Sequence, residues 1–200
     1  MTSRFAPTGA PIQNRRTREI NAVYRDILEF WFDEASPAQW WKKDATFDHL
    51  VADRFGHVHA QAARGELFEW RGTASGRLAE VIVLDQFSRN VFRDSAAAFA
   101  CDGMALVLAQ EAIAAGAEQA LRPVERSFLY MPFMHSESLK IHEIAVQLFE
   151  RNSIRDNLDY ELKHKAVIER FGRYPHRNAV LGRESTPDEV EFLKQPGSRF

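Results

Sequence analysis

The chain has 200 residues and a mass of 22.9 kDa, which fits one domain with a single core. Its 45% hydrophobic and 12% aromatic residues exclude disorder over most of the chain. The 26 basic and 28 acidic side chains leave a formal net charge of −2, so there is no overall positive field to hold a phosphate backbone. We therefore expect no nucleic-acid partner.

The single cysteine and the short apolar runs indicate the cellular compartment of the protein. Cys101 has no disulfide partner within the chain, which favours a reducing compartment. The most apolar run, residues 81–84, is far shorter than the roughly 18 residues of a membrane-spanning helix. We expect a soluble cytoplasmic protein with no membrane partner.

Residues 1–18 differ from the rest of the chain in composition. They contain four arginines, no acidic residue and no apolar period. A targeting peptide is the alternative for such a basic start, but the segment lacks the amphipathic or apolar stretch of one. We predict a flexible arm over residues 1–18, followed by a single domain over residues 19–200.

The domain begins with a helical pattern. From Ile20 onward apolar residues recur at three- and four-residue steps, which predicts a helix that ends near Phe32. Ser36, Pro37 and Gln39 then have the spacing of a capping box with proline at the first helical position. A second helix is therefore expected to start at Pro37.

The rest of the chain continues as helices. Gly65, Gly116 and Gly172 fit the left-handed residue that ends a helix, and Pro132 is expected to stop another. No window alternates apolar and polar residues as a strand would. The expected helices cover residues 44–64, 74–87, 96–115, 123–131, 137–151 and 156–171, with a last one starting at Pro187.

These patterns predict an all-α domain of antiparallel helical hairpins, because the connections are short and carry Gly or Pro. Residues 81–84 have no polar face over a full turn, so their helix is expected at the centre of the core. The side chains predicted to be buried are Ile27, Trp31, Val81, Leu84, Phe128, Val167 and Phe171.

Polar residues gather in the segment 84–90, which continues out of this apolar helix. Asp85 and Arg89 are four residues apart and can pair on one helical face, and Asn90 follows them. An ordinary ion pair at the end of a helix is one interpretation. Part of a binding pocket is the other, because an arginine next to a buried helix is rarely without a partner.

A second polar segment, residues 132–138, separates two expected helices and contains His135 and Glu137. Loops that hold such residues are frequent functional positions. A Ser-His-acid triad is a poor interpretation, because adjacent residues do not align as a relay. Ser136 is instead explained as the cap of a helix that begins at Glu137, which leaves His135 unexplained.

A third polar segment, residues 172–178, places Arg173, His176, Arg177 and Asn178 in a turn framed by glycine and proline. Arginine offers a planar fork that matches a carboxylate or a phosphate. The segment therefore suggests an anion site. A surface loop whose arginines pair with nearby glutamates is the alternative.

Metal binding is a weaker interpretation of the histidines. The sequence contains no His-Glu-x-x-His or Cys-x-x-Cys motif. A site could assemble only from His135, His164 and His176 across three segments, which spacing does not show. We predict neither a metal nor a cofactor.

Three motifs taken in order resemble a mostly bacterial domain-of-unknown-function family, number 924. The motifs are LDQFSRN at 84–90, FLYMPFMHSE at 128–137, and RFGRYPHRN at 170–178 with LGREST at 181–186. The resemblance covers nearly everything after the arm and implies a tetratricopeptide-like helical fold, with no established activity. Ser88 and Tyr174 stand where the family pattern has proline and phenylalanine.

We predict that the three segments form one polar pocket that binds a small anion, a carboxylate or a phosphate. Acid/base turnover by His135, Glu137 or His176 would make the protein an enzyme, which the sequence leaves open. The alternative is a helical scaffold that binds a peptide segment; the oligomeric state is left open as well. The candidate ligand-binding residues are Asp85, Arg89, Asn90, His135, His164, Arg173, His176, Arg177 and Asn178.

Overall fold

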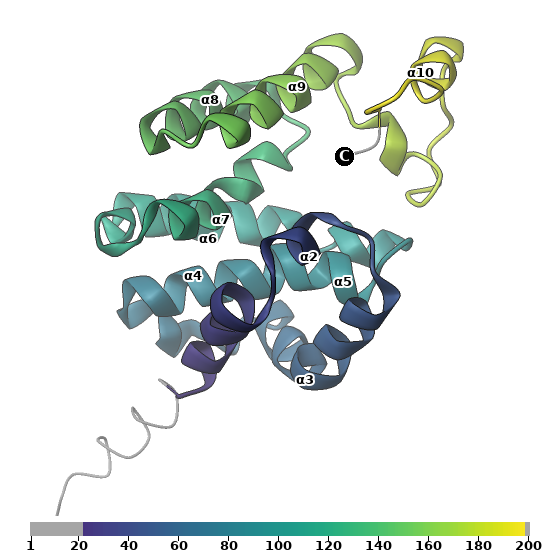
Figure 1. Ribbon diagram of the computed structural model, residues 1–200. Helices are drawn as coiled ribbons and strands as arrows, with labels where there is room; N and C mark the ends of the chain where they lie inside the picture. The colour runs from purple at the N-terminus through teal and green to yellow at the C-terminus, as the bar shows by residue number, and fades with distance from the viewer. Residues whose placement is uncertain (1–21, 199–200) are drawn as a thin grey trace, which may run out of the picture.

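The computed structural model describes residues 22–198 of the protein (Figure 1). Within that range the regular elements are helices and no strand occurs, so the all-α prediction is confirmed. The predicted arm over residues 1–18 lies outside the described residues.

The described chain begins with a helix over residues 22–34, whose last turn is the π-helical η1 (Phe30–Glu34). The longer elements that follow are α2 (Pro37–Trp41), α3 (Ala45–Ala63), α4 (Ala74–Ile82), π-helical η3 (Val83–Phe87), α5 (Ser88–Val91), α6 (Asp102–Ala114), α7 (Pro123–Met134), α8 (Leu139–Asn152), α9 (Arg155–Phe171) and α10 (Pro187–Phe192). Short 3₁₀ turns connect them: η2 (Phe68–Gly72), η4 (Ala96–Phe99), η5 (Ala117–Ala120) and η6 (Pro175–Arg177).

Helix ends lie where the local sequence signals placed them. Gln39 Oε1 accepts a hydrogen bond from the backbone N–H of Ser36 at 2.8 Å, so the predicted capping box of α2 is present. Gly65 and Gly172 follow α3 and α9 with φ angles of 72° and 69°, a left-handed conformation that a side chain disfavours.

Three of the predicted helix boundaries are wrong. Pro132 does not stop α7, which continues to Met134 because the flanking side chains of its last turn are all buried against the core. Ser136 is therefore not a helix cap, and α8 starts after Ser138 instead. The helix expected over residues 96–115 is split, because residues 100–101 separate η4 from α6.

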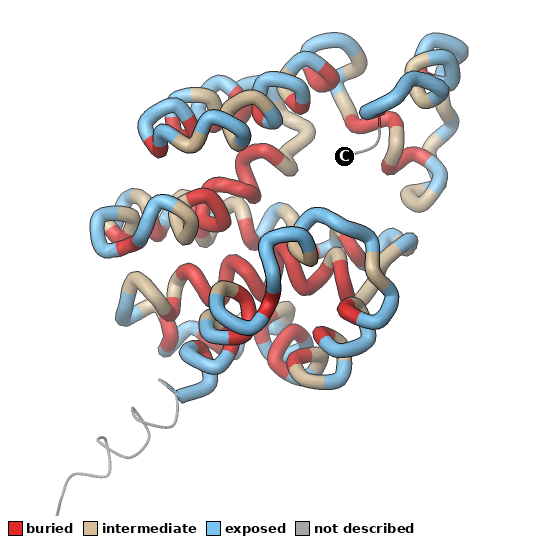
Figure 2. The backbone as a smooth tube through the Cα atoms, viewed as in Figure 1, coloured by how far each residue is buried: buried red, intermediate tan, exposed pale blue. Residues whose placement is uncertain are grey.

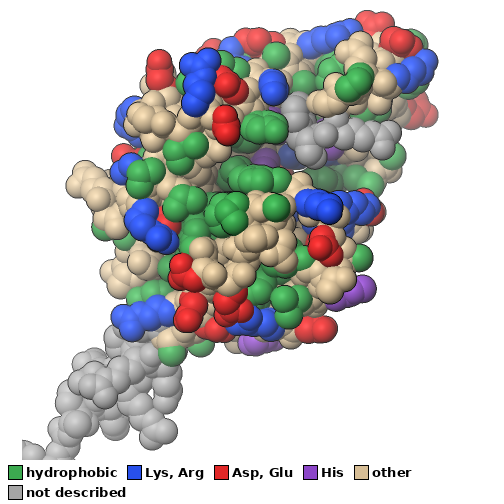
Figure 3. All heavy atoms as spheres, in the orientation of Figure 1, with side chains coloured by type: hydrophobic (Ala, Val, Ile, Leu, Met, Phe, Trp, Pro, Cys, Tyr) green, Lys and Arg blue, Asp and Glu red, His purple; other side chains and the backbone are tan. Residues whose placement is uncertain are grey.

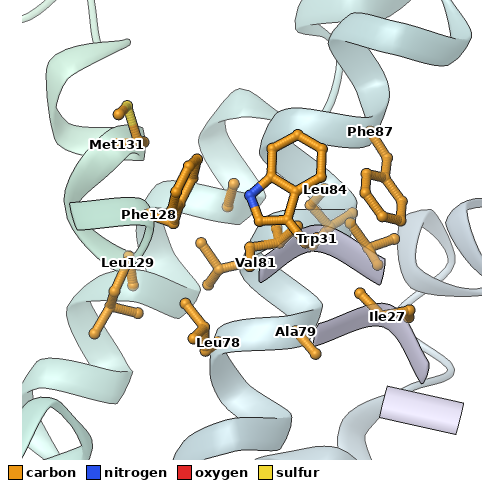
Figure 4. Close-up of a cluster of buried hydrophobic side chains, with 14 of the residues drawn as sticks. Ile27, Trp31, Leu78, Ala79, Val81, Leu84, Phe87, Phe128, Leu129 and Met131 are labelled. Atoms are coloured by element: carbon orange, nitrogen blue, oxygen red, sulfur yellow. The ribbon is translucent and has the colours of Figure 1, made fainter. Parts of the chain in front are cut away.

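The core forms where the first helix, α4 and α7 meet. Trp31 lies between Phe87 and Phe128, with ring centroids 5.6 Å and 5.5 Å away (Figure 4). Residues 81–84 are fully buried, as their apolar pattern predicts. Phe171 is the exception among the predicted core residues: it is only partly buried, because it packs on Phe192 in a small separate cluster.

The helices are arranged in stacked layers. α7 packs against α8, and α8 against α9, as successive antiparallel neighbours joined by short connections. α4 lies deeper and contacts both α6 and α7, and the buried residues follow these inner helices (Figure 2). η6 and α10 follow α9 at one end of the stack (Figure 1).

Residues 96–114 are long and apolar enough to cross a membrane by length and composition alone. In the structure this stretch is η4 and α6, and its face with Ala105, Ala109 and Ala112 is buried against the neighbouring helices. Because core helices of soluble proteins have the same composition, the stretch is weak evidence for a membrane span.

Candidate functional site

The site begins at the π turn η3, which interrupts the regular helix between α4 and α5. π turns are often found at functional positions, because the extra residue redirects the side chains that follow. Here the turn contains Asp85, whose carboxylate is fully buried. Arg89 Nη1 lies 3.3 Å from Asp85 Oδ1 and donates to the backbone oxygen of Asp85 at 2.8 Å.

His135, which follows the last residue of α7, is bound to the same carboxylate. Its Nδ1 lies 2.7 Å from Asp85 Oδ1, and the Gln86 amide donates to the other oxygen at 2.5 Å. Burial alone would raise the pKa of Asp85, but Arg89 and His135 outweigh it and lower the pKa well below its usual range. Asp85 is therefore an anion that accepts the Nδ1–H of His135.

Asp102 joins the arginines of two distant segments. Its carboxylate accepts from Arg89 Nη1 at 2.9 Å and from Arg177 Nη1 at 3.2 Å. Asp102 is the first residue of α6, where a helix favours negative charge. Sequence reasoning did not select Asp102, because an acidic residue in the first turn of a helix is too common to distinguish.

Arg177 is the most constrained cation of the site. Its side chain is buried between the rings of Phe99 and Tyr174, with the guanidinium carbon 4.6 Å and 4.5 Å from the ring centroids. Its Nε is buried and has no hydrogen-bond partner among residues 22–198. Burial, and then the positive charge of Arg89, lower the pKa of Arg177.

A cavity of about 320 Å³ lies beside these residues. Both polar and apolar residues line it. Basic and histidine side chains also show inside the hollow below α9 in the view of Figure 3. The polar residues are Asp102, His135, Ser136, Glu137 and Arg177, and the apolar residues are Ala96, Phe99, Ala100, Gly103, Leu106, Pro132 and Leu181.

Glu137, a predicted acid/base candidate, accepts hydrogen bonds on both of its carboxylate oxygens. It accepts from Arg183 Nη1 at 2.7 Å and Nη2 at 2.9 Å, and from the backbone N–H of Tyr174 at 2.7 Å. Burial raises its pKa, but these partners outweigh burial and lower the pKa. Glu137 is therefore a carboxylate that fastens the third segment to the second.

A buried histidine and glutamate hold the loop that carries His135. His142 Nδ1 lies 2.7 Å from Glu161 Oε1, and its Nε2 lies 2.9 Å from the backbone oxygen of Ser136. Both side chains are fully buried, and burial raises the pKa of Glu161. We did not identify either residue from the sequence, where they are ordinary polar positions of amphipathic helices.

His164 and His176 both lie against the ring of Tyr174. Their ring centroids are 5.7 Å and 5.5 Å from that of Tyr174. Burial lowers the pKa of His164 to about 3 and that of His176 to about 4, so both are neutral at pH 7. Among residues 22–198 no three His, Cys, Asp or Glu side chains are placed to hold a metal ion.

Only His135 and Arg177 of the nine candidate ligand-binding residues line the cavity, and three of the others contact acidic residues that do not line it either. Asn90 donates to Asp48 at 2.8 Å, which joins α5 to α3. Arg173 and Asn178 both bind Glu189 at the start of α10, at 2.6 Å and 3.3 Å. The structure thus brings together Asp85, Arg89, His135 and Arg177. His164 and His176 lie against the neighbouring Tyr174 ring.

The two departures from the family pattern add buried hydrogen bonds. Ser88 Oγ donates to the backbone oxygen of Leu84 at 2.5 Å and lies 2.7 Å from His59 Nε2. Tyr174 donates its hydroxyl to the backbone oxygen of Met134 at 2.5 Å, which ties the third segment to the end of α7.

Comparison with known proteins agrees with these motifs. No curated protein matches the chain. A solved structure, a protein of unknown function from Agrobacterium tumefaciens, is 41% identical over 87% of this chain and 98% of its own, with a TM-score of 0.83. The model of one family, bacterial proteins of unknown function (DUF924), matches residues 27–197. The chain therefore belongs to the DUF924 family of bacterial proteins.

Proposed function

We propose that this protein binds a small organic anion, a carboxylate or a phosphate ester, in the cavity beside Arg177. The observation that carries the proposal is the buried guanidinium itself. Arg177 has one carboxylate contact at 3.2 Å, and its Nε lacks a partner among the described residues. An unsatisfied buried donor is costly, and because Arg177 lines the cavity, an anionic ligand there would add charge-assisted hydrogen bonds to its guanidinium.

The charges around Arg177 support the same proposal. Asp85 and Asp102 neutralise Arg89, whose pKa they raise despite the burial that would lower it. Arg177 shares Asp102 with Arg89, and its pKa is lowered. The pair of arginines therefore repel each other across one shared carboxylate, and a bound anion would relieve this repulsion.

The cavity favours a small ligand over the alternative, a peptide segment on a helical scaffold. Its volume of about 320 Å³ is at the lower end of the 300–1,000 Å³ typical of small-molecule sites. Phe99, Leu106 and Leu181 also line the cavity, which suits an anion that carries a compact apolar group.

The test is a thermal-unfolding screen of phosphate, sulfate and small organic acids. A ligand at ten times its Kd adds about 1.4 kcal/mol, which raises the Tm of a 200-residue protein by about 3–5 °C. We expect Arg177→Ala to lose the shift, and Arg177→Lys to reduce it because lysine lacks the planar fork of donors that a guanidinium offers an anion. Arg155→Ala removes an exposed arginine of α9 and is the matched control, which should retain the shift.

Two results would contradict the proposal. One is a screen in which no anion raises the Tm of the native protein. The other is an equal shift in the native protein and in folded Arg177→Ala. Either result would favour the scaffold interpretation, in which the cavity is a gap between helices.

A further inference from the structure

One nitrogen of the His135 ring is hydrogen-bonded within the protein, and the other is free to bind a ligand. Nδ1 is bonded to Asp85, a fully buried residue that does not line the cavity. His135 itself lines the cavity. Because Nδ1 and Nε2 lie on different edges of an imidazole ring, we infer that the edge that carries Nε2 faces the cavity.

The hydrogen bond to Asp85 determines which nitrogen of His135 carries the proton. Ionised Asp85 accepts a hydrogen bond, so Nδ1 must carry the hydrogen. Burial, and then Arg89, lower the pKa of His135, which leaves the ring neutral and Nε2 without a proton at pH 7. The charged and titratable groups that face the ring are Asp85, Arg89, Asp102, His164 and His176.

A buried acid that orients a histidine is the usual support of a general base. Such a base needs a proton to remove. The cavity of about 320 Å³ has room for roughly ten waters at about 30 Å³ each, far more than an inorganic anion fills. A ligand bound to Arg177 therefore extends along the wall, where a second group can reach His135.

We propose that His135 Nε2 accepts a hydrogen bond from a hydroxyl group of the bound anion, the contact that a general base makes, so that the ligand is a hydroxy acid or a hydroxylated phosphate ester. This inference rests on the proposed function. The hydroxyl O–H donates to the lone pair of Nε2. Nδ1–H remains bonded to Asp85, which holds the ring in this tautomer.

The first test needs no ligand. ¹⁵N NMR of the native protein reports which nitrogen of His135 carries the proton, and exposed His57 serves as the reference histidine. We expect the Nδ1–H tautomer at pH 7, with protonation of Nε2 only below pH 6.5. A proton on Nε2 at pH 7 would overturn the proposal, whatever the ligand is.

The second test uses a matched pair of probes, 3-phenyllactate and 3-phenylpropionate, which differ by one hydroxyl group. Calorimetric titration of the native protein should give at least tenfold tighter binding of the hydroxy acid, a difference of about 1.4 kcal/mol. His135→Phe should bind both acids with the affinity of the deoxy acid. Arg177→Lys should weaken both acids by the same factor.

The outcomes separate the two proposals. Equal binding of the two acids by the native protein would overturn the role of His135 and leave anion binding intact. A tenfold preference that persists in His135→Phe would do the same. Stabilisation by phosphate without binding of either acid would overturn the hydroxy-acid class, and no response to any anion would overturn both proposals.

Discussion

Glu161 shows how one buried side chain can hold a functional loop. His142 donates its Nε2–H to the backbone oxygen of Ser136, so its Nδ1 can only accept when the ring is neutral. We predict that Glu161 supplies the hydrogen as a protonated carboxyl, which agrees with the direction of its pKa shift and with an Oε2 that has no partner among the described residues. The pair fixes the loop that positions His135.

We predict that Glu161→Gln keeps this geometry, because the amide N–H replaces the carboxyl O–H. A raised pKa means that Glu161 contributes stability below its ordinary pKa of 4.5, and that this contribution is lost as the pH rises through the folded value. The free energy of unfolding of Glu161→Gln relative to the native protein should therefore increase from pH 5 to pH 8 in urea titrations.

The control at this position is Glu161→Ala, which removes the hydrogen bond to His142 and leaves a cavity. We expect it to be less stable than Glu161→Gln at every pH, because a buried histidine nitrogen loses its partner. A difference between Glu161→Gln and the native protein that is constant with pH would contradict a protonated Glu161.

At the scale of elements, the π turn η3 connects the core to the site. Leu84 of this turn is fully buried in the core, whereas the next residue, Asp85, binds His135 and Arg89. A regular α-helix turns about 100° per residue, so an extra residue in the turn changes which side chains point to the core and which to the cavity. The packing of η3 in the core therefore determines where Asp85 lies in the site.

We predict that Leu84→Ala costs about 2–5 kcal/mol of unfolding free energy, the range for a leucine removed from a packed core. Leu139→Ala is the matched control, because Leu139 is 40% exposed at the start of α8 and should cost less than about 1 kcal/mol. Urea unfolding at pH 7 measures both. A loss below about 1 kcal/mol for Leu84→Ala would place η3 outside the stabilising core.

At the scale of the whole molecule, four histidines from different elements have lowered pKa values. Burial is the largest cause for His59, His135, His164 and His176. These rings are neutral in the folded protein at pH values where the unfolded chain, with a histidine pKa near 6.5, takes up protons. Folding therefore releases protons, and acidification favours the unfolded chain.

We predict that stability is highest above pH 6.5 and falls as the pH drops toward the folded pKa of about 4 for His176. Carboxyl groups with lowered pKa values act in the same direction only below about pH 4.5. The stability lost through the histidines and the stability lost through the carboxyl groups therefore fall in different pH ranges. Urea unfolding at pH 7, 6 and 5 measures the slope, and His176→Gln should reduce it. In Glu161→Gln, which lacks the opposite pH dependence of Glu161, a flat profile from pH 7 to pH 5 would show that these histidines titrate normally.

The sequence by itself determined the elements whose causes are local. The capping box at Ser36 and the left-handed glycine at 172 depend on neighbouring residues, and the structure places both where they were predicted. The fully apolar run 81–84 has no polar side to expose, so its burial follows from composition. The order of the three motifs was enough to indicate the family.

Only the tertiary structure decided which polar residues meet. Asp102 binds arginines 13 and 75 residues away along the chain, and Asn90 contacts Asp48 outside the cavity wall. Pro132 remains inside α7 because the burial of that turn outweighs the local preference of proline. Such outcomes depend on how helices distant in sequence pack, since a charged side chain takes the partner that packing brings within reach.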